Sequence, residues 1–130
     1  MSFPPFNTPT SPLPSADSRG TRAALIFALT AERLSLWYEH GQWPTEAQGA
    51  TLAADWLART RRRLPLAERR HLSDLSDQLA RSMAASLSLE AGLFTVHEMM
   101  EALDPNYESE HARALMAECE RLLDGEADAG

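Results

Sequence analysis

Two Glu-x-x-His units give this chain its clearest arrangement of potential metal ligands. They read ERRH at Glu68–His71 and ESEH at Glu108–His111. In a four-helix bundle, such units on two helices combine with single glutamates from the other two to hold a di-iron or di-manganese centre. Glu32 lies in line with the apolar stripe of the first helical segment and could supply one of these glutamates. The fourth helical segment offers no glutamate on its apolar stripe, so we expect no cofactor and keep these five residues as alternative metal candidates.

A second pattern places two acids one helical turn apart, in DLSD at 74–77 and again in EMME at 98–101. On antiparallel helices, two such pairs can hold Mg²⁺ and support the hydrolysis of a nucleotide pyrophosphate. This spacing is similar to that of the helical nucleotide pyrophosphohydrolases. Arg70 and Arg81 flank the first pair at a spacing of four residues. We therefore expect those aspartates to form ion pairs on an outward face, and we keep a metal-dependent enzyme as an alternative.

The segment ARTRRRLPLAERRH at 58–71 has the highest density of basic residues. It holds six of the twelve basic residues, all arginines, which we call the arginine island: Arg59, Arg61, Arg62, Arg63, Arg69 and Arg70. Some of these have ordinary helical roles, since a cation near a helix C-terminus contributes about 0.3–1 kcal/mol. Asp55 and Asp74 also stand four residues from Arg59 and Arg70, a favourable spacing for ion pairs. The other four arginines lack such a partner, so we expect them to converge on a site for an anion or an acidic partner.

Charge is distributed unevenly along the chain. Residues 19–81 carry ten arginines against seven acids, which gives +3, and residues 82–130 carry two against eleven, which gives −9. With Asp17, the sum is the formal net charge of −7. Positive and negative charge separated in this way produces an electric field that steers charged partners. We therefore expect the arginine island to bind an acidic protein surface, including that of a second copy.

Nucleic acid is the less favoured partner of the arginine island. No aromatic residue is interleaved with the arginines, as it is in single-strand binders. The sequence also shows no helix-turn-helix pattern with a base-reading second helix. A nucleic-acid-associated regulator that uses the Arg59–Arg70 corner is therefore an alternative.

Composition limits the class of protein. Hydrophobic residues make up 44% of 130 residues, enough for one core. The longest apolar run, Ala23–Leu29, is far shorter than the roughly 20 residues of a membrane-spanning helix, and the first residues do not resemble a signal peptide. We therefore expect no membrane association. The one cysteine, Cys119, excludes an internal disulfide and predicts a reducing, cytoplasmic location.

Proline positions and helical periodicity predict an all-α protein with no sheet. We expect a compact bundle of about five helices, one of them short, in residues 19–125. A disordered proline-rich tail at 1–18 precedes it, and a frayed acidic end at 126–130 follows. The helices are expected at about 21–40, 45–64, 66–88, 95–103 and 106–124. Capping boxes at Thr45 and Thr95 start the second and fourth helices, and Trp37 and Trp43 are expected to meet at the turn between the first two.

No catalytic set is complete, and Cys119 falls on an apolar helical stripe, where a thiol is inert. The sequence therefore predicts a non-enzymatic protein-interaction module: an adaptor, a regulator or an inhibitor of a protein partner. The alternatives are the small metal-dependent enzyme and the nucleic-acid-associated regulator described above.

Overall fold

The computed structural model describes residues 14–104 and 106–129. Its helices are α1 (Pro14–His40), α2 (Glu46–Arg59), α3 (Leu66–Ser86), α4 (Leu89–Ala102) and α5 (Glu110–Ala129). No strand occurs in this part of the chain, so the predicted all-α bundle of five helices is confirmed. Residues 1–13 of the predicted tail, Pro105 and Gly130 lie outside the described residues. Within the described ranges, no helix combines the length and the apolar character needed to cross a membrane.

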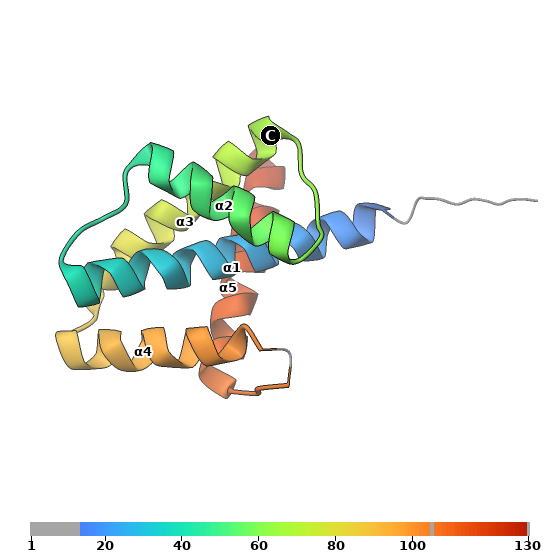
Figure 1. Cartoon of the computed structure of the whole chain (residues 1–130). Helices are drawn as coiled ribbons and strands as arrows, with labels where there is room; N and C mark the ends of the chain where they lie inside the picture. The colour runs from blue at the N-terminus through green and yellow to red at the C-terminus, as the bar shows by residue number, and fades with distance from the viewer. Residues whose placement is uncertain (1–13, 105, 130) are drawn as a thin grey trace, which may run out of the picture.

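Helix α1 is the centre of the bundle, and each of the other four helices packs against it (Figure 1). It takes this place because it is apolar around most of its circumference, which makes a helix buried on several sides. Leu25, Ile26, Leu29 and Leu34 are fully buried. Helices α2 and α4 lie on opposite sides of α1 in Figure 1, while α2 also packs on α3 and α4 also packs on α5.

The connection between α1 and α2 follows the prediction closely. The Thr45 hydroxyl accepts a hydrogen bond from the Gln48 N–H at 3.1 Å, and the Gln48 side chain accepts one from the Thr45 N–H at 2.8 Å. This is the predicted capping box. Trp37 and Trp43 stack with ring centroids 4.8 Å apart and planes 5° apart, and the Arg81 guanidinium lies 4.9 Å from the Trp43 ring.

Several helix boundaries differ from those expected. Helix α1 already begins at Pro14, within the range predicted as tail, and α2 ends at Arg59 rather than near Leu64. Helix α4 begins at Leu89, because the Ser88 hydroxyl caps it by accepting a hydrogen bond from the Ala91 N–H at 3.2 Å. The predicted capping box at Thr95 was therefore wrong, and Thr95 is buried inside the helix.

Helix α5 begins later and ends later than expected. It starts at Glu110, where the Ser109 hydroxyl caps it by accepting a hydrogen bond from the Ala112 N–H at 3.2 Å. It then continues through Gly125 to Ala129, so Gly125 does not end the helix. Cys119 is buried on the inward face of α5, as expected, and burial raises the pKa of its thiol to about 12.

One arginine, Arg33 of α1, lies in the core and is only 4% exposed. Its guanidinium donates hydrogen bonds to the Ser73 hydroxyl at 2.7 Å and to the Ser76 hydroxyl at 3.0 Å, and it forms an ion pair with Asp77 at 3.2 Å. On the α2 side, a Cβ added to Gly49 would lie 2.6 Å from the Arg33 guanidinium. Gly49 therefore lets α2 approach this buried arginine, whose hydrogen bonds join α1 to α3.

Candidate functional site

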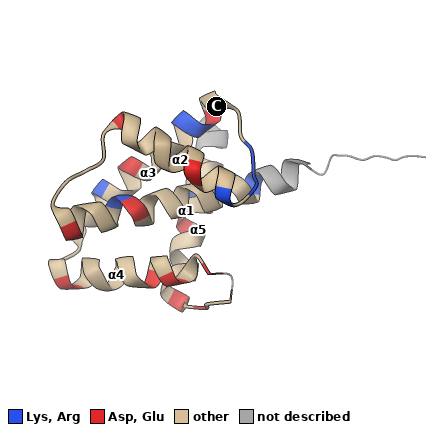
Figure 2. Ribbon diagram, viewed as in Figure 1, with Lys and Arg blue, Asp and Glu red and all other residues tan. Residues whose placement is uncertain are grey.

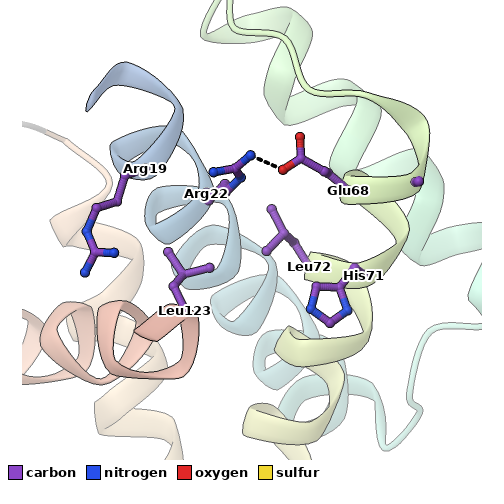
Figure 3. Close-up of a pocket in the computed structure, with 7 residues that line it drawn as sticks. Arg19, Arg22, Glu68, His71, Leu72 and Leu123 are labelled. Atoms are coloured by element: carbon purple, nitrogen blue, oxygen red, sulfur yellow. Dashed lines mark ion pairs between the residues drawn. The ribbon is translucent and has the colours of Figure 1, made fainter. Parts of the chain in front are cut away.

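The first Glu-x-x-His unit lies beside a hollow of about 400 Å³ between α1, α3 and α5 (Figure 3). Glu68 forms an ion pair with Arg22 across this hollow, and Leu123 of α5 lines its other side. His71 lies one turn along α3 from Glu68. The carboxylate is thus used to join α1 to α3.

The second unit is divided between a loop and a helix, because α5 begins only at Glu110. Glu108 precedes the helix and pairs with Arg113 at 3.1 Å. The His111 Nε2 lies 3.2 Å from the Thr95 hydroxyl. Glu32, on α1, completes no set either, since no group of three or more His, Cys, Asp or Glu side chains in the described residues could hold a metal ion. The five metal candidates are therefore not brought together.

One acid of each pair considered for Mg²⁺ has partners of its own. Asp77 binds two arginines, one of them the exposed Arg81 at 3.0 Å. Glu98 accepts hydrogen bonds from the Tyr107 hydroxyl at 2.8 Å and from the Ser109 hydroxyl at 2.6 Å. These two hydrogen bonds stabilise the carboxylate, so they lower the pKa of Glu98. Both acids therefore stabilise the bundle rather than forming a cation site.

The arginines of the chain divide into two sets of six by their ion pairs. Every arginine outside the arginine island pairs with an acid: Arg19 with Asp124, Arg22 with Glu68, Arg33 and Arg81 with Asp77, Arg113 with Glu108, and Arg121 with Glu118. Within the described residues, none of the six island arginines forms an ion pair. Figure 2 shows blue segments at the end of α2, on its connection to α3 and at the start of α3. The arginine island is therefore a concentration of uncompensated positive charge.

Two ion pairs expected within the arginine island are not formed. Arg59 and Asp55 make no ion pair, and neither do Arg70 and Asp74, although each pair has the helical spacing of four residues. The prediction that these two acids neutralise the charges of Arg59 and Arg70 was wrong for the described part of the chain. Arg69 adds an unsatisfied donor, because its Nε is buried and no described group accepts its hydrogen bond.

The second helix was expected to include the three adjacent arginines, Arg61–Arg63. They lie instead in the connection that follows α2, which ends at Arg59. The Arg61 N–H donates to the Ala58 carbonyl at 3.2 Å, and the Arg62 N–H donates to the Leu57 carbonyl at 2.9 Å. This is a Schellman ending, whose left-handed residue is usually glycine. Arg61 fills that place with φ of 57°, at a cost of about 1 kcal/mol relative to glycine. Strained residues of this kind concentrate at functional sites.

A groove between α2 and α3 adjoins the arginine island, and we call it the α2–α3 groove. It has a volume of about 380 Å³, and Arg69 and Arg70 line it together with alanine side chains of α2. Leu66 also lines it and is 53% exposed. Ala50, also in its lining, is exposed. The groove therefore sets a small apolar surface beside the guanidinium groups.

The comparisons with known proteins give no match to any family model, to any curated protein or to any solved structure. The functional interpretation therefore depends on the geometry of the chain itself.

Proposed function

We propose that this protein is a non-enzymatic interaction module, an adaptor or regulator that binds an acidic surface of a protein partner through the arginine island. The observation that carries the proposal is the division of the arginines: six form ion pairs within the fold, three of them between different helices, and six form none among the described residues. Guanidinium groups that are not needed by the fold are free to bind carboxylates of another molecule.

Local conformation supports the same role. Arg61 keeps a left-handed conformation that would favour glycine, so the fold gains nothing from an arginine there. Pro65, at the N-cap of α3, supplies no side-chain hydrogen bond to the first turn of that helix. The positive end of the α3 dipole therefore adds to the field of the arginine island.

A protein partner fits this surface better than a nucleic acid does. Arg62 covers the ring of Trp56 at 5.4 Å, and Trp56 is itself buried. It therefore offers no open ring on which a base could stack, as single-strand binders require. The apolar groove with the exposed Leu66 is better matched by the side chains of a protein. We further propose the cytoplasm as the location, because the single cysteine is a buried free thiol.

Binding to labelled poly-L-glutamate tests this proposal, with a single-stranded DNA of equal charge as the competitor. The island variant replaces Arg59, Arg61, Arg63 and Arg70 with Gln, four exposed side chains without an ion pair in the described residues. We expect it to bind polyglutamate about tenfold more weakly, because four losses of roughly 0.2–1 kcal/mol sum to roughly 0.8–4 kcal/mol, a range that includes the 1.4 kcal/mol of a tenfold change. Wild-type binding should also weaken as salt rises to physiological strength, where the screening length is about 8 Å.

Three results would count against the proposal. Equal binding by the wild type and a folded island variant would show that the arginine island is not the binding surface. Tighter binding of the DNA than of polyglutamate would assign the surface to nucleic acid. If the wild type fails to bind polyglutamate even at low salt, the proposal of an acidic partner is wrong.

A further inference from the structure

Helix α4 carries an exposed apolar face on the other side of the molecule from α2. Its buried side, with Gly92, Val96 and Met99, packs toward α1. On the opposite side, Leu89 is 63% exposed and Leu93 is 42% exposed, and we call these two residues with Phe94 the α4 outer face. Phe94 is 58% exposed and lies beside the His111 ring, with centroids 6.0 Å apart. Three large apolar side chains exposed on one helix are a candidate interaction surface.

The charge around the α4 outer face is negative. Helix α4 contains three glutamates and no arginine, and it is drawn only in red and tan in Figure 2. Glu90 lies within the first turn of α4, next to Leu89. Glu90 precedes Leu93 by three residues and Phe94 by four, so it lies on the same exposed face as both, and the α4 outer face is apolar and acidic together.

The α2–α3 groove has the complementary character. Its apolar surface includes the exposed Leu66 and Ala50, and Arg69 and Arg70 stand at its side, continuous with the rest of the arginine island. Two carboxylates, Glu46 and Asp74, also line it and balance the charges of Arg69 and Arg70. The net positive charge beside the groove comes from the other four island arginines, at the end of α2 and in its connection to α3. An occupant should therefore combine aliphatic side chains with acids, and the α4 outer face is a surface of that composition.

We propose that the α4 outer face of one molecule docks in the α2–α3 groove of a second copy of this chain. This inference rests on the proposed function and names the acidic partner. The contact cannot form within one molecule, because α2 and α4 lie on opposite sides of α1 (Figure 1). Between molecules it joins two different surfaces, so it is heterologous, and it produces either a ring or an open chain of copies.

Analytical ultracentrifugation of two complementary variants tests the inference. On the groove side, the island variant removes the charge of Arg70, which lines the groove, and the charges of three neighbouring arginines. The α4 side is removed in a face variant with Leu89→Gln and Leu93→Gln, both at exposed positions. Wild type should associate beyond the dimer at low salt, and each variant alone should associate at least tenfold more weakly. An equimolar mixture should form a 1:1 heterodimer and nothing larger, since only one intact groove and one intact face remain.

The substitution Leu103→Gln provides the matched control, because Leu103 is an exposed leucine beyond the end of α4. It should associate like the wild type. Circular dichroism should show every variant folded. A mixture that stays monomeric would overturn the inference, and so would an island variant that still dimerises, because that result indicates a symmetric contact through α4.

Failure of this inference is distinguishable from failure of the proposed function. A wild type that stays monomeric at all concentrations but binds polyglutamate through the arginine island would refute self-association alone. A wild type that neither associates nor binds polyglutamate would refute both.

Discussion

The buried Arg33 and the arginine island show arginine in two different roles within one small bundle. Arg33 has its donors satisfied by Ser73, Ser76 and Asp77 and joins α1 to α3. The arginine island lies at a corner, and no acid in the described residues neutralises it. The difference shows that arginine content alone says little about function. What separates a structural arginine from a binding one is whether the fold itself supplies its partner.

The substitution Arg33→Ala is expected to have the largest effect, a loss of stability. It leaves the buried hydroxyls of Ser73 and Ser76 without their donor and creates a cavity. We expect a loss of about 2–4 kcal/mol in the free energy of unfolding, measured with urea. Arg63→Ala, at an exposed position of the island, is the control and should change stability by less than about 0.5 kcal/mol. Similar values for the two would mean that the distinction between the two sets is wrong.

A smaller effect is expected for Gly49→Ala, which brings a methyl group to 2.6 Å from the Arg33 guanidinium and 3.2 Å from the Ser73 hydroxyl. Overpacking of this kind costs about 1–3 kcal/mol, partly offset by the higher helix propensity of alanine. Gly20→Ala in α1 is the matched control, because nothing lies within 4 Å of the added Cβ. The melting temperature should therefore fall for Gly49→Ala and rise slightly for Gly20→Ala. Stabilisation by both substitutions would show that Gly49 is not needed for the approach of α2.

The smallest effect concerns Arg61, the strained member of the island. Arg61→Gly should raise the free energy of unfolding by about 0.5–1 kcal/mol, because glycine adopts φ of 57° without steric cost. Arg63→Gly removes the same charge at a position without positive φ and should not stabilise the protein. Urea unfolding of the two variants side by side measures the difference. Destabilisation by Arg61→Gly would show that Arg61 is not strained.

Sequence patterns predicted the elements well where the signal is local. The capping box at Thr45, the stacked pair Trp37 and Trp43, and the all-α class depend on residues close in the chain, and the structure confirms them. The pattern of uncompensated arginines was partly predictable too. The expected partners Asp55 and Asp74 had the right spacing, but spacing alone does not decide which rotamer a long side chain adopts.

Features that depend on distant residues could not be predicted in this way. The partners of Arg33 stand 40 to 44 positions away, in α3. Gly92 lies inside α4 because a Cβ there would be 2.0 Å from the Tyr38 ring, and no local signal reveals that contact. The end of α2 was misplaced because its left-handed residue is Arg61, where the usual signal is a glycine. The exposure of Leu66, Leu89 and Leu93 likewise depends on how the helices pack.

The most direct test of the division between the two sets of arginines compares two variants with the same net charge. One is the island variant, and the other replaces four exposed, paired arginines with Gln: Arg19, Arg81, Arg113 and Arg121. Polyglutamate affinity at one low salt concentration is the measurement. We predict that the island variant loses about tenfold in affinity, while the paired-set variant keeps its affinity and only its melting temperature falls modestly. Equal losses of affinity in the two variants would contradict the account, because net charge alone would then explain binding.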